Sequence, residues 1–107
     1  SMDYSLDNFI WHDGNINSLN FTVSKSGASI EIEAEFYSTP DSTQRDKYTI
    51  NCGDVFRLNN VINFLEIIDN FSAGSVSNGY LKENTLWLYL IDGVIEIHAN
   101  EIKVSKH

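Results

Sequence analysis

The sequence contains few of the residues that mark disulfide-rich or membrane-spanning proteins. It has one cysteine and one proline among 107 residues. The single Cys52 excludes an internal disulfide and fits a reducing compartment. No apolar run approaches the roughly 20 residues that a membrane helix needs, and no basic and apolar signal peptide opens the chain. We therefore expect a cytoplasmic protein without a membrane partner.

Basic residues are also scarce, with 7 Lys and Arg against 15 Asp and Glu and a net charge of −8. Nucleic acids and anionic lipids are bound through clusters of Lys and Arg, so this balance argues against both and favours a basic partner. Acidity that serves solubility alone is the alternative. A content of 42% hydrophobic and 21% charged residues is typical of a globular protein, and the length predicts a single domain over residues 1–107.

The clearest structural pattern runs from Gly79 to Val104. Asp92-Gly93 suits a two-residue type I′ turn, since these residues tolerate a positive φ. Glu83-Asn84 and Asn100-Glu101 fit the same strand count as further two-residue loops. The segment therefore predicts a four-stranded antiparallel meander with these opposed pairs: Ile91 and Val94, Leu90 and Ile95, Leu88 and Ile97, Leu86 and Ala99, Leu81 and Leu86, Ile102 and Ala99, and Val104 and Ile97.

A second hairpin is predicted between Ser18 and Tyr37. Apolar and polar residues alternate on both sides of Ser26-Gly27, which fits a two-residue loop. The count places Val23 opposite Ile30, Phe21 opposite Ile32 and Leu19 opposite Ala34. Glu31, Glu33 and Glu35 then share the face opposite to the apolar one, and we call these three residues the glutamate row.

The rest of the chain supplies shorter signals. Asp13-Gly14 is a candidate hairpin turn after Phe9, Ile10 and Trp11, and residues 46–52 alternate as a further strand. Apolar residues at three- and four-residue spacing predict one amphipathic helix near 55–71, with Asp54 as its N-cap. The fold class is therefore mainly β (α+β), with seven or eight antiparallel strands and one helix. A β-sandwich and one curved sheet both fit this pattern.

No catalytic or metal-binding motif is present, and we expect a protein that is not an enzyme and binds no cofactor. The three histidines lack the spacing of metal ligands, and one cysteine cannot build a common zinc site. Cys52 and His98 could form a thiol and base, but Cys52 falls on the apolar side of its strand. A structural thiol is the more common role at such a position.

The glutamate row is the first candidate partner-binding site. Alternate side chains on one face of a strand lie about 6.6 to 6.8 Å apart, close to the roughly 6 to 7 Å between phosphates of an extended nucleic acid. Three carboxylates at this spacing can occupy a phosphate-binding track on a basic protein. A solvated sheet face, or an edge strand protected by charge, is the alternative. We place three further residues in this site: Tyr37, Asp41 and Asp46.

A second candidate patch lies on the polar face of the C-terminal meander. It contains Tyr80, Trp87, Tyr89, Glu96 and His98. The predicted turns oppose Tyr80 to Trp87, Tyr89 to Glu96 and Trp87 to His98. Tyr and Trp supply contact area at low entropic cost, so they are frequent in binding hot spots. The same residues are equally typical of a second buried sheet face beneath a helix.

Two segments also carry a family resemblance. The runs Asn78-Gly79-Tyr80-Leu81 and Leu86-Trp87-Leu88-Tyr89-Leu90-Ile91-Asp92-Gly93, in a small, acidic, cysteine-poor β-rich chain, resemble the immunity proteins of bacterial contact-dependent growth inhibition systems. The resemblance is to the branch that neutralises a ribonuclease-A-like toxin domain. It implies a cytoplasmic antidote that binds a basic cognate toxin and blocks its active site, and it transfers no individual residue.

Two other functions fit the residues. A small-ligand or carbohydrate-binding β-domain would use Trp87, Tyr89 and His98, because aromatic rings stack on sugars and flat ligands. A structural subunit or adaptor would instead bind through an exposed strand edge.

Overall fold

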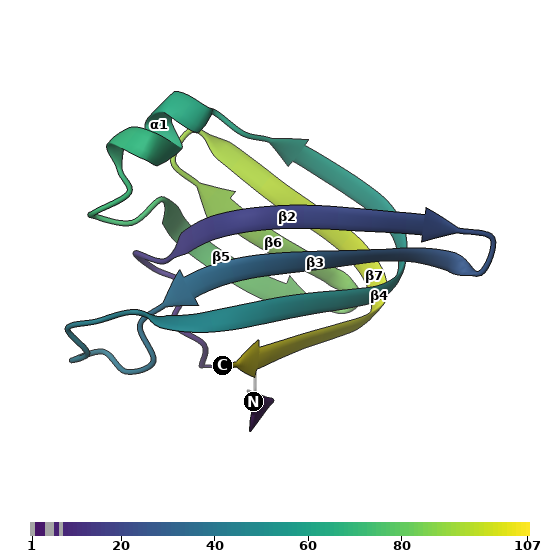
Figure 1. Cartoon of the computed structure of the whole chain (residues 1–107), viewed down its shortest axis with the longest axis horizontal. Coiled ribbons are helices and arrows are strands. Elements are labelled where there is room, and N and C mark those ends of the chain that lie inside the picture. Colours follow the sequence, from purple (N-terminus) through teal and green to yellow (C-terminus); the bar gives the residue numbers. More distant parts are fainter. Residues whose placement is uncertain (1, 4–5, 7) are drawn as a thin grey trace.

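The computed structural model describes residues 2–3, 6 and 8–107, and it is mainly β with antiparallel pairing. Six strands follow one another across one open sheet in the order β2-β3-β4-β7-β6-β5, and β1 pairs with β7 off this path (Figure 1). Because these strands belong to one sheet, the β-sandwich prediction is not confirmed. The elements are β1 (Met2–Asp3), β2 (Asn15–Ser24), β3 (Gly27–Phe36), β4 (Asp46–Val61), α1 (Phe64–Asp69), β5 (Val76–Lys82), β6 (Thr85–Leu90) and β7 (Gly93–Lys106).

Two long strands bend this sheet. β4 and β7 have 16 and 14 residues, and they pair along nearly their whole length with a register shift between Val55 and Arg57. Asp54, just before the shift, has a left-handed φ of 49°. A bulge of this kind bends a strand and increases its twist. The first half of β4 therefore lies with β2 and β3, while β5 and β6 lie behind them (Figure 1).

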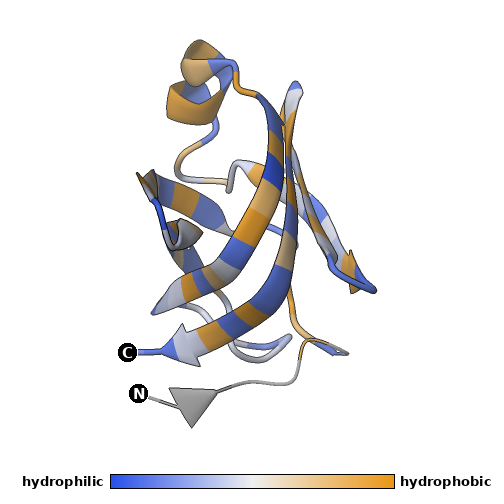
Figure 2. Cartoon of the chain, turned by 90° about the vertical axis from the view of Figure 1, so that its right-hand side faces the viewer, coloured by the Kyte–Doolittle hydropathy of each residue, from blue (hydrophilic) through white to orange (hydrophobic). Residues whose placement is uncertain are grey.

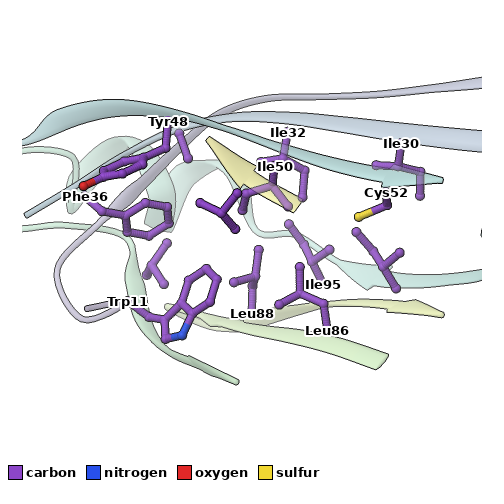
Figure 3. Packing of buried hydrophobic residues seen from close by; sticks show 14 of the residues in the cluster. Trp11, Ile30, Ile32, Phe36, Tyr48, Ile50, Cys52, Leu86, Leu88 and Ile95 are labelled. Atoms are coloured by element: carbon purple, nitrogen blue, oxygen red, sulfur yellow. The ribbon is translucent and has the colours of Figure 1, made fainter. Parts of the chain in front are cut away.

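The hydrophobic core fills the space between the two halves of the bent sheet. Apolar and polar residues alternate along the strands (Figure 2), so each strand has an inner, apolar face and an outer face. Figure 3 shows Ile32 and Ile50 from one half pointing toward Leu86, Leu88 and Ile95 from the other. All five are fully buried, and each contributes about 1.5 to 3 kcal/mol through burial.

Three of the predicted hairpins are present, but two of their turns lie one residue earlier than expected. The β6–β7 turn is Ile91-Asp92, which pairs Leu90 with Gly93. The β2–β3 turn is Lys25-Ser26, which pairs Ser24 with Gly27. Both registers therefore differ by two residues from the prediction, and the corresponding predicted pairs are wrong. A shift of two keeps every side chain on its predicted face.

Of the other two turns predicted in the C-terminal meander, Glu83-Asn84 is confirmed and Asn100-Glu101 is wrong. Glu83-Asn84 joins β5 to β6, with Leu81 opposite Leu86 and Tyr80 opposite Trp87. Asn100-Glu101 is no loop, because β7 continues through it to pair with the first half of β4. Ile102 and Val104 therefore lie opposite Cys52 and Ile50, and the pairs predicted with Ala99 and Ile97 do not form.

The predicted helix over residues 55–71 is strand in its first part and helix only over a short later part. β4 runs to Val61, and the helix is limited to Phe64–Asp69. Asp54 is a strand residue with positive φ and does not cap the helix. Asn63 is the N-cap, and its side chain accepts a hydrogen bond from the backbone N–H of Glu66 at 3.3 Å. The Asn and β-branched residues of 55–62 have low helix propensity, so pairing with β7 prevails there.

Residues 8–14, which precede β2, pack without strand structure. The turn at Asp13 exists, with a φ of 65°, but residues 9–11 form no strand, so this predicted hairpin is wrong. Phe9 and Trp11 join Phe36 and Tyr48 in an aromatic cluster with ring centroids 4.4 to 5.9 Å apart. A Cβ at Gly79 would lie 2.9 Å from the Trp11 ring, so glycine is required beneath it.

Asn15 connects this region to the loop after α1. Its side-chain amide donates to the carbonyl of Phe71 (2.8 Å), and its side-chain oxygen accepts from the N–H and the hydroxyl of Ser75 (2.9 and 3.1 Å). Within the described residues, no helix is long and apolar enough to cross a membrane.

Candidate functional site

The glutamate row lies on the outer face of β3. Ile30, Ile32 and Ala34 alternate with the three glutamates and are buried on the inner face. On the β2 side, Asn20 lies opposite Glu31 and Ser18 opposite Glu33. The strand backbone therefore holds three carboxylates in one line, and the neighbours on this side are neutral.

Basic and polar groups accompany the row on its other side. On β4, Asn51, Thr49 and Lys47 lie opposite Glu31, Glu33 and Glu35, respectively. The Thr49 hydroxyl donates to Glu33 at 2.9 Å, and Nε2 of His107 lies 3.4 Å from the same carboxylate. These contacts orient Glu33.

A shallow polar depression adjoins Glu31. It has a volume of about 370 Å³, and its lining includes Asn51, Glu101 and Lys103. Lys103 lies opposite Asn51 and its amine is 3.8 Å from Glu101. The outer face therefore presents carboxylates and amines together, a pattern suited to recognising a charged protein surface.

The other residues predicted for this site contact groups outside the row. The guanidinium of Arg45 stacks on the Tyr37 ring at 4.8 Å, and Asp41 accepts from the Thr39 hydroxyl within the connection between β3 and β4. Asp46 lies opposite Phe36, on the face that the glutamates do not share.

Asp46 is engaged within the fold. It accepts from the Ser38 hydroxyl at 2.8 Å and lies 3.4 Å from the Lys106 amine. The Ser38 hydrogen bond, and after it the Lys106 charge, lower the pKa of Asp46 below its ordinary value. The sheet thus brings Glu31, Glu33 and Glu35 together but does not add Asp46 to their row.

The second candidate site is an aromatic patch formed by Tyr80, Trp87 and Tyr89 on the outer face of β5 and β6. Tyr80 stacks on Trp87 with ring centroids 4.7 Å apart and on Tyr89 with centroids 6.1 Å apart. A hydrogen bond with Tyr80 raises the pKa of the Tyr89 phenol. Tyr80 and Tyr89 are 42% and 37% exposed, and α1 stands beyond the sheet at one end of the molecule (Figure 1). The patch is therefore a solvent-facing surface.

Glu96 and His98 flank the aromatic patch on β7. Trp87 lies opposite Glu96, and Thr85, not Trp87, lies opposite His98; Tyr89 lies opposite Val94. Nε2 of His98 is 2.5 Å from the Glu96 carboxylate, and Nδ1 is 3.1 Å from the Thr85 hydroxyl. Both ring nitrogens are thus engaged within the protein, which fixes the imidazole.

Cys52 and His98 do not form a catalytic pair. Cys52 is buried and pairs with Ile102 on the inner face, whereas His98 is on the outer face opposite Arg57. Burial raises the pKa of the Cys52 thiol to about 11, so it is not ionised near neutral pH. Among the described residues, no group of three or more His, Cys, Asp and Glu side chains could hold a metal ion.

The sequence patterns missed a third surface, which is apolar. Phe21 and Val23 were expected in the core but are 65% and 69% exposed. Together with side chains of β4 and α1 they border two apolar depressions, which we call together the apolar groove. One is lined by Ile62, Phe64, Ile68 and Phe71, and the other by Phe21, Val23, Phe56 and Leu58. Alternation predicted the correct face of β2, but not that the bent sheet leaves the end of this face uncovered.

The comparisons with known proteins give no relative. No family model, curated protein or solved structure matches this chain.

Proposed function

We propose that this chain is an immunity protein that binds a basic cognate toxin, a ribonuclease, and blocks its active site. The observation that carries the proposal is the glutamate row, which holds three carboxylates in line on the outer face of β3. Their spacing of about 6.6 to 6.8 Å is close to that of successive phosphates. A cleft that binds an RNA backbone can therefore bind this row.

The charge of the chain supports the same partner. A ribonuclease needs a positive surface to hold RNA, and a net charge of −8 accelerates its encounter with the inhibitor. Thr49 orients Glu33 before the partner arrives, which reduces the entropy lost on binding. Lys47, Lys103 and His107 along the row would pair with acidic groups around the cleft and restrict the inhibitor to one toxin.

The experiment is to co-express the chain with the C-terminal domain encoded immediately upstream of its gene, and to measure complex formation and cell survival. The test variant carries Glu31→Lys, Glu33→Lys and Glu35→Lys. The control variant carries Glu66→Lys, Asp69→Lys and Glu83→Lys, three acidic positions outside the row, and has the same net charge. We expect both to slow association, and only the first to accelerate dissociation and to weaken binding by several kcal/mol, on the order of 3 to 5.

Three results would contradict this proposal. They are the absence of any complex, equal losses in the two variants, and an unchanged affinity in the variant of the row. Circular dichroism of the free variants, together with a Glu-to-Gln triple variant, separates loss of contact from loss of fold.

The aromatic patch supports a second candidate, a small-ligand or carbohydrate-binding β-domain. Three stacked rings that are partly exposed form an apolar surface, and the neighbouring Glu96 and His98 supply polar groups at its border. A panel of sugars and flat ligands should then change the fluorescence of Trp87. Trp11 is 4% exposed, so a Trp87→Phe variant gives the signal of the buried tryptophan as a control. A signal change that persists in this variant would exclude the patch.

A further inference from the structure

The bent sheet has two unpaired strand edges on the same side. Within the described residues, β2 pairs only with β3, and the second half of β4 pairs only with β7. Side chains of both strands line the apolar groove. One part of it, about 660 Å³, lies between β2, the end of β4 and α1, and the other, about 280 Å³, lies between Phe21 and Phe56. The two edges therefore face each other across an open seam.

The seam exposes a large apolar area. Phe21, Phe56 and Phe64 are each about two thirds exposed, and Val23, Ile68 and Phe71 add to the same surface. At about 150 to 250 Å² for a large side chain, the six side chains present roughly 700 Å². Divided between the two parts of the groove, this area exceeds the few hundred Å² of apolar patches that are usual on monomeric proteins. It approaches the roughly 800 Å² that each partner buries in a protein interface of standard size.

The seam is also nearly free of charge. β2 has ten residues, Asn-Ile-Asn-Ser-Leu-Asn-Phe-Thr-Val-Ser, with no charged residue and no proline. Arg57 is the one charged residue that lines either part of the groove. Edge strands of monomeric proteins usually carry Lys or Pro or are covered, because a bare edge pairs with another chain. In the part of the chain that the structure describes, the β2 edge has no Lys, Pro or covering element. Its register shift lies at one end, between Ile16 and Ser18, so that the pairing with β3 is regular from Ser18 to Ser24.

We infer that the seam binds a second copy of this chain, through antiparallel pairing of β2 with β2 about a two-fold axis. A basic toxin would gain no ion pair from an uncharged groove, whereas an uncharged edge is complementary to itself. Two copies that each carry −8 repel one another, so they can approach closely only where charge is absent. The pairing joins the sheets of the two copies and buries Phe21 and Val23 against the partner. The inference does not depend on the proposed function.

Light scattering and sedimentation of the purified chain between about 1 and 500 µM test this inference. We expect a dimer with a dissociation constant in the micromolar range, because the interface is of modest area. The dimer should tighten as salt rises, since salt screens the repulsion between copies. Phe21→Lys with Val23→Lys should weaken the dimer at least tenfold. These side chains are exposed in the monomer, so the variant retains its fold.

A matched control places two lysines on the other half of the sheet, as Tyr80→Lys with Tyr89→Lys, and should leave the dimer intact. Single cysteines introduced along residues 16–23 test the geometry. The position on the two-fold axis faces its own copy at a Cα separation of about 4.5 to 5.5 Å and should form a disulfide much faster than its neighbours. Cys52 does not compete, because it is buried and its thiol has a raised pKa.

A chain that remains monomeric at 500 µM would overturn the inference. A dimer that survives the Phe21 and Val23 variant, or one in which no position of β2 cross-links preferentially, would also do so. If the wild-type chain is monomeric and the same variant loses affinity for the toxin, the seam belongs to the toxin contact and not to a second copy.

Discussion

Replacement of the buried Asn15 by leucine tests whether one side chain holds the loop after α1 in place. Asn15 and Ser75 are 1% and 0% exposed. The Asn15 side chain makes three hydrogen bonds across this junction, one to the Phe71 carbonyl and two to Ser75. Leucine has a similar size but neither donates nor accepts, so the Ser75 N–H and the Phe71 carbonyl would lose their partners.

The expected destabilisation follows from these two groups. An intramolecular hydrogen bond contributes about 0.5 to 1.5 kcal/mol net, and a buried group left unpaired costs about 1 to 3 kcal/mol. We expect Asn15→Leu to lower the free energy of unfolding by about 3 kcal/mol. At an m-value of about 1 to 1.5 kcal/mol/M, the urea midpoint should fall by roughly 2 to 3 M. Fluorescence of the buried Trp11 reports the transition.

Two controls define the result. Ser75→Ala removes only the 3.1 Å hydroxyl bond and should cost about 1 kcal/mol. Asn17→Ala changes an exposed residue of the same strand and should alter stability by less than about 0.5 kcal/mol. A loss below about 1 kcal/mol in Asn15→Leu would refute the reasoning, because the loop would then be held by other contacts.

Two further predictions concern titrating groups. Cys52 should not react with a thiol reagent at pH 8 while the protein is folded, because its thiol is buried with a pKa of about 11. The unfolded chain in urea should react rapidly. Rapid labelling of the native protein would contradict the burial of Cys52. Asp46 has a pKa below its ordinary value, so it binds fewer protons in the folded state than in the unfolded state. The ionised carboxylate therefore stabilises the fold above the unfolded pKa, and this stabilisation is lost as pH falls through the folded pKa. Ser38→Ala should raise the Asp46 pKa in a carboxyl NMR titration and flatten this acid limb, and an unchanged Asp46 titration would show that the Ser38 hydrogen bond does not set the pKa.

Several features of the fold could be predicted from alternation and turn chemistry. The inner faces of β3, β6 and β7 are correct because a period of two defines a face without a partner. The exact pairs are wrong for two hairpins because Asp92-Gly93 and Ser26-Gly27 allow more than one turn position. Both errors are shifts of two residues, since a shift of one would have exposed the apolar face.

The long-range pairing of β4 with β7 could not be predicted from local patterns. Leu58, Val61, Ile62 and Leu65 fit a helical period, yet residues 55–61 form a strand because β7 offers a partner edge there. Asn100 and Glu101 are typical of turns, but the pairing of β7 with the long strand β4 keeps this segment extended. Exposure of the apolar groove follows from the bend at Asp54, and no local signal in the sequence places that bend.

The bend also determines how the candidate surfaces can be used. The glutamate row and the aromatic patch lie on the same outer face of one sheet, but in different halves of it. Because the inner faces of the two halves pack against each other, the outer faces point in opposite directions. A partner held by Glu31 and Glu33 therefore leaves Tyr80 and Trp87 free, whereas the unpaired edge of β2 adjoins the row because β2 pairs with β3. Inhibitor binding and ligand binding thus do not compete sterically at their centres, and a mutation in the aromatic patch should leave binding through the glutamate row unchanged.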